Sequence, residues 1–318
     1  MSEADPFSSY SRSVCELAAI GDPVGLPEVL VGALDHAVRH NLGEDHVLES
    51  MHPVGGGCIH RAYVLECRGA RFFAKVNAAT RWHNFTAEED GLKALARAGV
   101  TVPSVVSLGT TPGHAYLLLR FMDLGALDGD SARGLGRALA TMHARDAGAR
   151  YGWHRANYIG ATPQSNGWHD DWASFWAEER IAPQLELAKR NALGDSLQTL
   201  GARLLERFPA LLAGHAPKPA LVHGDLWSGN AGALVSGEPV VFDPAVYVGD
   251  AEVDLAMTEL FGGFPRAFYA GYVEVSPIAP GYEARKPLYN LYHVLNHANL
   301  FGGGYVAQAE RLMSQLLH

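Results

Sequence analysis

The chain has 318 residues, 48% hydrophobic and 19% charged, the composition of a globular protein long enough for two compact lobes. Its formal net charge of −9 argues against nucleic acids and anionic membranes as partners, because both require a basic surface. No apolar run reaches the length of a membrane span, and Cys15, Cys58 and Cys67 are too few for a disulfide framework, so a cytoplasmic location is expected.

The first predicted element is a helix that begins near Pro27, because apolar residues recur at helical spacing over 29–38. The period then changes, and three strands are predicted over 51–54, 61–66 and 71–76. The start of the chain therefore combines a helix with a small sheet.

A glycine triplet lies between the first two of these strands. The N–H groups of Gly55, Gly56 and Gly57 can approach phosphate oxygens closely, although a plain hairpin turn is the commoner reason for such a triplet. Cys58 follows directly, where N–H dipoles favour a thiolate. We predict a phosphate-binding loop in which Cys58 is either redox-sensitive or simply a small residue that fills the turn.

Lys75 lies in the third predicted strand among apolar neighbours. A helix is predicted over about 86–98, with a glycine stop at Gly99, and it contains Glu88 and Glu89. Kinases position nucleotide phosphates with a strand lysine fixed by a helix glutamate. An exposed strand lysine without such a role is the alternative.

Two further strands are predicted over 102–108 and 115–121, after which the sequence becomes mostly helical. The only strand-like segments expected there flank a loop near residue 225. We therefore predict an α+β protein with a bilobal, kinase-like organisation. Residues 1–122 would form the small β-rich lobe that binds nucleotide phosphates, and residues 123–318 the larger helical lobe with the catalytic, metal and substrate sites.

The most informative segment is the loop at 223–230, with the sequence His-Gly-Asp-Leu-Trp-Ser-Gly-Asn. Asp225 and Asn230 have the spacing of a kinase catalytic loop, in which the Asp accepts the proton of the attacking hydroxyl and the Asn binds Mg²⁺. A second apolar run ends at Asp243, whose carboxylate can bind the same ion because Mg²⁺ takes oxygen ligands. A capped turn is the alternative, but the succession of loop, strand and carboxylate predicts phosphoryl transfer.

His293 and His297 lie four residues apart on a predicted helix near the C-terminus. Such a pair can chelate a transition metal, but the sequence suggests no third ligand. Asn296 lies between them, and a polar stripe that faces a sugar fits His293 and Asn296 as well. We predict substrate contact for these two residues.

Several motifs together resemble the fructosamine kinase (ketosamine-3-kinase) family. They are the loop at 223–230, Asp243-Pro244-Ala245, Phe85-Thr86-Ala87-Glu88, Phe261-Gly262-Gly263-Phe264 and the segments 157–160, 164–168 and 289–297. The matches run from about residue 54 to residue 310. The resemblance implies a protein-kinase-like fold, ATP with Mg²⁺ as cofactors, and phosphorylation of the 3-hydroxyl group of a ketosamine formed by glycation.

The resemblance also implies a role for each site residue. Asp225 is expected to be the catalytic base, Asn230 and Asp243 the metal ligands, and Lys75 with Glu88 the phosphate-positioning pair. The segment with Arg120, Phe121 and Met122 would be the hinge that reads adenine, and Trp227 would face the sugar.

One departure from the family is visible. Family members commonly have an arginine where this chain has Ala251, between Asp250 and Glu252. The missing arginine leaves open which group pairs with the neighbouring carboxylates.

Two other functions remain open. One is a kinase for another small alcohol, such as an aminoglycoside or choline, against which Trp227 and the Phe-Gly-Gly-Phe segment argue. The other is a nucleotide-binding module without catalysis, which the presence of Asp225, Asn230, Asp243 and Lys75 disfavours. The expected partner is a small-molecule or protein-bound ketosamine, and the chain is expected to be a monomer or a homodimer.

Overall fold

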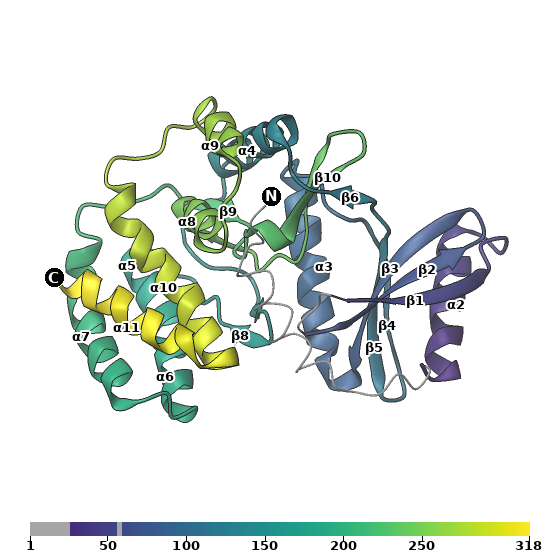
Figure 1. Cartoon of the computed structure of the whole chain (residues 1–318), viewed down its shortest axis with the longest axis horizontal. Coiled ribbons are helices and arrows are strands. Elements are labelled where there is room, and N and C mark those ends of the chain that lie inside the picture. Colours follow the sequence, from purple (N-terminus) through teal and green to yellow (C-terminus); the bar gives the residue numbers. More distant parts are fainter. Residues whose placement is uncertain (1–25, 56–58) are drawn as a thin grey trace, which may run out of the picture. The chain divides into compact units, whose positions relative to one another are not determined.

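The computed structural model describes residues 26–55 and 59–318, and the chain divides into two compact units. The first contains the described residues up to Leu92 together with Val102–Asp123, and the second contains Lys93–Thr101 and Leu124–His318. Figure 1 labels most of the elements of both units. In the part of the chain that the structure describes, no helix is long and apolar enough to cross a membrane.

The first unit is built around a five-stranded antiparallel sheet with the strand order β1-β2-β3-β5-β4. The strands are β1 (Leu48–Val54), β2 (Arg61–Cys67), β3 (Ala70–Ala78), β4 (Val105–Thr111) and β5 (His114–Arg120). Its helices are α2 (Glu28–Leu42) and the part of α3 (Trp82–Arg97) up to Leu92, and the short 3₁₀ turn η1 (Ala79–Arg81) leads into α3.

The alternation of side chains along the strands assigns one face of this sheet to each helix. Phe72, Ala74 and Val76 of β3 pack in a core with Leu30 and Leu34 of α2. The opposite face packs against α3, where Leu117 and Leu119 of β5 meet Phe85 and Leu92. Because Lys75 alternates with Ala74 and Val76, it projects to the α3 side of the sheet.

Several predicted boundaries in this unit are wrong by three or four residues, among them the start of the strand predicted from 51, which begins at Leu48. The helix predicted from residue 86 begins at Trp82, because the hydroxyl of Thr86 donates to the carbonyl of His83 within the helix instead of capping its start. The strand predicted from residue 102 begins at Val105, since Pro103 has no N–H group to donate to a ladder.

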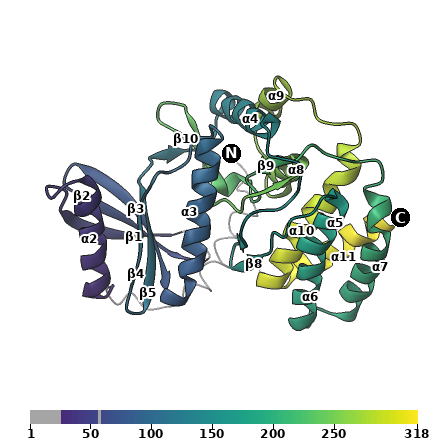
Figure 2. The same cartoon turned by 180° about the vertical axis from the view of Figure 1, so that it is seen from behind.

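The second unit is mainly helical, and its helices α5, α6, α7, α10 and α11 lie together in Figure 2. Its helices are α4 (Gly129–Ala144), α5 (Trp172–Trp176), the π-helical turn η2 (Ala177–Ile181), α6 (Ala182–Arg190), α7 (Asp195–Leu211), η3 (Ser228–Asn230), α8 (Glu252–Leu260), α9 (Arg266–Val273), α10 (Tyr282–Phe301) and α11 (Gly304–Leu317). Its strands are β6 (Leu124–Gly125), β7 (Asn157–Ile159), β8 (Thr162–Gln164), β9 (Ala220–Val222), β10 (Ala231–Leu234), β11 (Pro239–Val241) and β12 (Tyr247–Gly249).

The prediction of an α+β protein with a small sheet and a larger helical part is confirmed. The expectation that strands in the second part only flank the loop is wrong, because β7 and β8 form a separate hairpin. Asn157 and Gln164 of this hairpin hydrogen-bond the carbonyls of Val246 and Ala245. Side chains, not a long ladder, thus attach these three-residue strands to the segment after Asp243.

An arginine lies at the centre of the helical core. Arg180 of η2 is fully buried, and its guanidinium carbon lies 4.0 Å from the ring centroid of Tyr247 and 4.7 Å from that of Phe175. It donates to the carbonyl of Ser165 and to Oδ1 of Asn166. The buried cation therefore fixes the chain just after the β7–β8 hairpin through hydrogen bonds and ring faces.

Candidate active site

The loop at 223–230 connects β9 to β10 and brings Asp225 and Asn230 together. Nδ2 of Asn230 donates to the backbone carbonyl of Asp225 at 2.9 Å and to its Oδ2 at 3.2 Å. Asn230 is buried, whereas the Asp225 side chain is 20% exposed. The loop thus orients the carboxylate of Asp225 and leaves it accessible to a ligand.

Asp243 lies at the same end of the β10–β11 pair as Asn230. β10 begins directly after Asn230, β11 ends two residues before Asp243, and Ala231 pairs with Val241 in the antiparallel ladder. The N–H of Phe242 donates to the carbonyl of Asn230 at 3.0 Å, which continues the pairing beyond the strands. Asp243 has a φ of +56°, a left-handed conformation that is rare for residues other than glycine. Local strain therefore accompanies the placement of this carboxylate.

Two glycines make this loop conformation possible. Gly224 has a φ of +80°, and a Cβ atom there would lie 2.2 Å from the carbonyl oxygen of Ala245. A Cβ atom at Gly229 would lie 2.2 Å from the indole of Trp227. Gly224 is therefore required by its backbone conformation and by the Ala245 backbone, whereas a side chain at position 229 would have to displace the indole of Trp227.

Asp254 of α8 fixes the backbone at the start of the loop. Its Oδ2 accepts the N–H of His223 at 2.7 Å, and its Oδ1 accepts the N–H of Gly224 at 2.9 Å. Nε2 of His143 lies 3.2 Å from Oδ2, and Nδ1 of His143 lies 2.9 Å from the hydroxyl of Tyr272. Burial by itself would raise the pKa of Asp254, but these hydrogen bonds and the nearby histidines hold it below its usual value. An ionised carboxylate is thus built into the base of the loop.

Burial also fixes the state of His223. Its Nε2 donates to the carbonyl of Phe242 at 3.0 Å, and its Nδ1 accepts the N–H of Asp225 at 3.2 Å. Burial lowers the pKa of His223, so the neutral ring serves as donor on one side and acceptor on the other. His223 thereby connects the loop with the strand end that carries Asp243.

The pKa of Asp225 is raised to about 7. Burial is the main cause, repulsion by the carboxylate of Asp243 adds to it, and the hydrogen bond from Asn230 opposes it. A carboxylate with such a pKa is suited to accept a proton near neutral pH.

His293 of α10 faces this carboxylate. Its Nδ1 lies 3.9 Å from Oδ1 of Asp225, and the imidazole is buried. Burial, with a smaller contribution from the neighbouring His297, lowers the pKa of His293 to about 3. Nδ1 of His297 instead donates to the carbonyl of His293 at 2.8 Å, one helical turn below. The two histidines therefore have different surroundings, and the helix backbone already uses one nitrogen of His297.

The other two predicted substrate residues differ in how far the fold uses them. Asn296 is buried, and its amide contacts the carbonyl of Ile159 and the side chain of Gln184, both at 3.4 Å. Trp227 is half-buried, and its indole lies edge-on to Phe261, with 6.3 Å between the ring centroids. The hydroxyl of Ser228 donates to the carbonyl of Phe261 at 3.3 Å, so the Phe-Gly-Gly-Phe segment is attached to the loop.

In the first unit, called the sheet unit here, Lys75 and Glu88 form a buried ion pair, with 2.6 Å between Nζ and Oε1.

The other predicted nucleotide-binding residues lie at the ends of strands. Gly55 follows β1 directly, and Gly56, Gly57 and Cys58 lie outside the described residues. In the predicted hinge, the N–H of Arg120 donates to Ser104 and that of Phe121 to Arg71. The half-buried Met122 follows these two residues.

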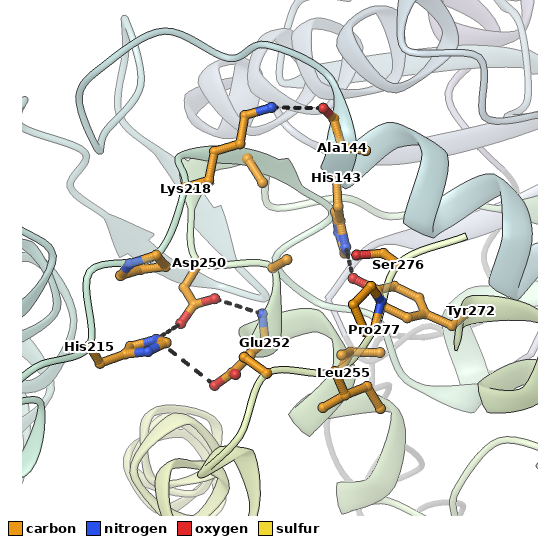
Figure 3. Close-up of a pocket in the computed structure, with 15 residues that line it drawn as sticks. His143, Ala144, His215, Lys218, Asp250, Glu252, Leu255, Tyr272, Ser276 and Pro277 are labelled. Atoms are coloured by element: carbon orange, nitrogen blue, oxygen red, sulfur yellow. Dashed lines mark hydrogen bonds and ion pairs between the residues drawn. The ribbon is translucent and has the colours of Figure 1, made fainter. Parts of the chain in front are cut away.

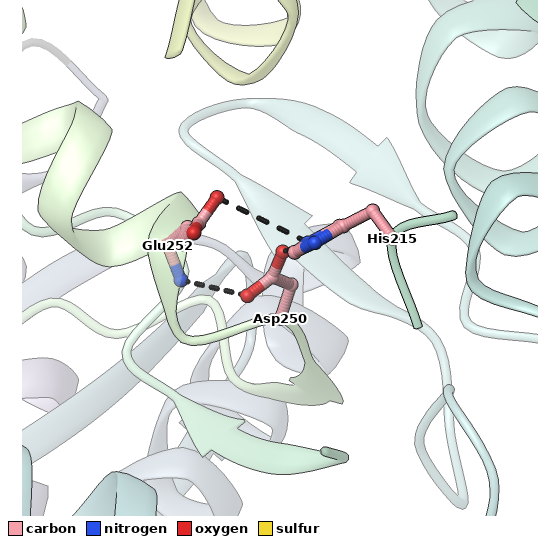
Figure 4. A group of neighbouring side chains, drawn as sticks. All are labelled: His215, Asp250 and Glu252. Atoms are coloured by element: carbon pink, nitrogen blue, oxygen red, sulfur yellow. Dashed lines mark hydrogen bonds and ion pairs between the residues drawn. The ribbon is translucent and has the colours of Figure 1, made fainter. Parts of the chain in front are cut away.

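Asp250 and Glu252 have partners despite the missing arginine. Glu252 accepts two hydrogen bonds from Arg285, at 2.6 and 2.7 Å. Asp250 accepts the hydroxyl of Tyr289 and lies 2.6 Å from Nε2 of His215. Figures 3 and 4 show Asp250 beside His215 and Glu252. Asp250, Glu252 and His215 line a cavity of about 380 Å³ that also borders Ala251 and Lys218. Arg285, from another helix, therefore supplies the guanidinium that position 251 lacks.

Sequence reasoning missed Asp254 and His143 as supports of the loop. The role of Asp254 could have been predicted, because it is a carboxylate within the apolar run Val253–Met257 of α8. Buried charges of this kind require nearby donors. The role of His143 could not have been predicted, because its partners lie more than 100 positions away in the sequence.

Comparison with known proteins links this arrangement to a family. The family model described as fructosamine kinase matches residues 31–318. A protein of Synechocystis sp. named probable ketoamine kinase is 48% identical over 281 residues, which cover 88% of this chain and 94% of that protein. The chloroplastic protein-ribulosamine 3-kinase of Oryza sativa subsp. japonica is 40% identical over 267 residues, which cover 83% of this chain and 78% of that protein.

Solved structures agree with these matches. The crystal structure of a candidate fructosamine-3-kinase from Haemophilus somnus 129PT has a TM-score of 0.83 at 29% identity, covering 90% of this chain and 97% of that one. A choline kinase of Streptococcus pneumoniae has a TM-score of 0.62 at 14% identity, covering 91% of this chain and 98% of that one. At that identity the likeness concerns the fold alone, and it confirms the predicted protein-kinase-like fold.

Proposed function

Because this chain belongs to the fructosamine kinase family, we propose that it transfers the γ-phosphoryl group of ATP to the 3-hydroxyl group of a ketosamine. The observation that carries the proposal is the loop at 223–230, in which Asn230 orients the partly exposed carboxylate of Asp225 opposite His293. Asp225 would accept the proton of the attacking hydroxyl, a role that suits its raised pKa.

Asn230 and Asp243 have the donor set that Mg²⁺ requires. Nδ2 of Asn230 donates to Asp225, so its oxygen Oδ1 would be the ligand, together with a carboxylate oxygen of Asp243. A bound Mg²⁺ ion bridges and neutralises nucleotide phosphates. The left-handed backbone at Asp243 supports the proposal, since strain of this kind concentrates at functional sites.

In the sheet unit, Lys75 would contact the nucleotide phosphates while Glu88 holds its ammonium in place. The N–H groups of Arg120 and Phe121 already donate to carbonyls, so adenine recognition through an N–H group of this segment falls to Met122. Gly55 would begin the loop that covers the phosphates.

The sugar would lie between His293 and Trp227. A neutral imidazole can donate to or accept from a sugar hydroxyl without repelling the protonated amine of a ketosamine. The face of the Trp227 indole can pack against the sugar ring, and its π electrons can attract the ammonium group of the substrate. Asn296 would support the site indirectly, through its contact with the carbonyl of Ile159, and not by touching the sugar.

Relatives of this chain are named as ketoamine kinases and as a protein-ribulosamine 3-kinase, which supports ketosamines, protein-bound ones among them, as candidate substrates. The small number of cysteines supports a reducing compartment such as the cytoplasm for this activity.

The proposal is tested with purified protein, Mg·ATP and a panel of acceptors. The panel contains fructosamine, ribulosamine and erythrulosamine derivatives of one amine, with choline and an aminoglycoside as acceptors of other kinases. We expect phosphorylation of at least one ketosamine, at the 3-position by ³¹P NMR, and efficiencies at least about 100-fold lower for the other acceptors. Preference for choline or the aminoglycoside, or phosphate on another hydroxyl, would overturn the proposal.

A further inference from the structure

Aromatic rings continue outward from Trp227 in an unbroken series. The indole of Trp227 is followed by Phe261 at 6.3 Å, and Phe261 by His297 at 4.6 Å between ring centroids. His297 then contacts Phe301 at 5.5 Å and Tyr305 at 5.0 Å. These five residues, Trp227, Phe261, His297, Phe301 and Tyr305, are called the aromatic strip here.

The strip leads away from the catalytic carboxylate along one side of α10. His293, His297 and Phe301 are spaced four residues apart, so their side chains lie one above another on the helix. Eight residues of helix separate the first from the third, a rise of about 12 Å. His293, beside Asp225, is 4% exposed, His297 is half-buried and Phe301 is 38% exposed. The strip therefore runs from the reacting end of the site towards solvent.

No positive charge lies on the strip itself. Burial lowers the pKa of His297, and its Nδ1 donates to the carbonyl of His293, so the ring is neutral. Burial raises the pKa of Tyr305, which keeps its phenol protonated. Aromatic faces carry negative potential and attract cations, and a neutral imidazole leaves that attraction unopposed.

We propose that the aromatic strip binds the substituent on the amine of the ketosamine substrate, and that it selects apolar, long aliphatic or aromatic substituents. The inference rests on the proposed function, which puts the sugar between His293 and Trp227. With the sugar there, the amine and the group attached to it extend along the strip. Phe301 and Tyr305 would contact the part of the substituent farthest from the sugar, and the ring faces nearer Trp227 would contact the ammonium group.

The occupant follows from two features of the strip. It begins beside the residues that would hold the reacting sugar, so a group joined covalently to that sugar reaches it. It is also longer than an amine nitrogen alone, because Phe301 lies about 12 Å along the helix from His293. An apolar or lysine-like chain fits such a surface, since its methylene groups pack on rings while its nitrogen remains near the π faces.

The test compares ketosamines that share one sugar and differ only in the amine: methylamine, butylamine and benzylamine derivatives. For the wild-type enzyme we expect kcat/KM to rise from methyl to benzyl by about tenfold, mainly through KM, because the strip contacts lie away from the reacting atoms. In Phe301→Ala and Tyr305→Ala this preference for the benzyl derivative should fall to about twofold or less. Phe301→Leu should keep much of the preference for butyl but lose much of that for benzyl.

Val273→Ala is the matched control, because Val273 is 49% exposed on α9 and has no part in the strip. It should retain the wild-type ratio. Melting temperatures of all variants identify any loss of folding, and the ratio between substrates is independent of the fraction of active enzyme. Equal efficiency on methyl and benzyl derivatives in the wild type, or an unchanged ratio in well-folded Phe301→Ala and Tyr305→Ala, would overturn the inference. Failure to phosphorylate any of the three ketosamines would instead overturn the proposed function on which it rests.

Discussion

Nδ1 of His293 lies 3.9 Å from Oδ1 of Asp225, one in a helix and the other in a loop. The separation is too long for a direct hydrogen bond but allows one hydroxyl group or water molecule to contact both atoms. Because the pKa of His293 is lowered to about 3, its ring adds no positive charge beside the carboxylate near neutral pH. The carboxylate of Asp225 therefore keeps its raised pKa.

The first prediction is that Asp225→Asn abolishes turnover yet stabilises the protein without ligands. Loss of the base should lower kcat by about 10²–10⁴-fold. A folded-state pKa of about 7 against 3.8 penalises the ionised carboxylate by at most about 4 kcal/mol at pH 8. Because the folded pKa is raised, the wild type loses this stability as the pH rises from about 4 to 7, and the variant does not.

The measurement is the melting temperature of both proteins between pH 5 and pH 8. The advantage of Asp225→Asn should grow with pH, whereas Glu186→Gln, at an exposed position of α6, should show no such trend. A variant that melts below the wild type at pH 8, or that retains turnover within about threefold, would contradict the prediction.

The second prediction concerns Asp243. Asp243→Asn keeps a residue that tolerates the left-handed backbone but removes the charge that would bind Mg²⁺. The Mg²⁺ concentration for half-maximal activity should rise at least about tenfold, and Mg·ADP should bind more weakly by calorimetry. ADP with a chelator should bind both proteins alike, which separates loss of the metal site from damage to the nucleotide site. Normal affinity for Mg·ADP would show that Asp243 is not a ligand.

The third prediction is that Trp227→Leu raises KM for cationic ketosamines. A cation over an indole gains about 0.5–2 kcal/mol, which corresponds to about 2–30-fold in KM. KM of the wild type should also rise with salt, because the net charge of −9 attracts a cation from a distance and salt screens that attraction. The matched substrate is the neutral ketose without the amine, for which both effects should be small. Equal efficiency on the two substrates would reject the role.

The fourth prediction is that Asp254→Asn lowers kcat without contact between residue 254 and the substrate. An amide oxygen can accept one of the two backbone N–H groups, and its NH₂ group faces the other without accepting. We expect a loss of about 2–4 kcal/mol of stability and a lower kcat with nearly unchanged KM. Glu259→Gln, on the same helix but partly exposed, is the control. A change in KM with kcat unchanged would argue against a positioning role for Asp254.

The fifth prediction concerns the buried pair in the sheet unit. Glu88→Gln removes the carboxylate charge that lies 2.6 Å from the ammonium of Lys75, and breaking a buried pair costs about 3–5 kcal/mol. Melting temperature should fall and KM for ATP should rise, whereas Glu89→Gln should change KM for ATP by less than about twofold. If Glu89→Gln has the larger effect on KM, the pairing does not hold in the working enzyme.

Much of the site was predictable because its spacing is local. Asp225 and Asn230 belong to one loop, and Asp243 follows the next apolar run, so an antiparallel turn is enough to bring all three to one end of β10 and β11. The side of the sheet on which Lys75 lies also follows from strand alternation alone. These features need only short-range periodicity and turn geometry.

Other features depend on contacts that periodicity does not encode. The β7–β8 strands are three residues long, include Pro163, and are attached by Asn157 and Gln164 to carbonyls about 80 positions away. The partners of Asp250 and Glu252 are residues 215, 285 and 289. Which groups pair with these carboxylates in the absence of an arginine at position 251 could therefore not be predicted from the neighbouring sequence. Side-chain hydrogen bonds across such distances depend on the completed fold.

The left-handed backbone at Asp243 has an evolutionary consequence. A glycine would relieve that conformation, so the backbone geometry at this position by itself favours glycine over aspartate. Relief of backbone strain should favour glycine or asparagine at this position, whereas selection for catalysis should hold it as aspartate. Homologous proteins that keep the fold but have lost the activity would thus be recognised by the residue at position 243.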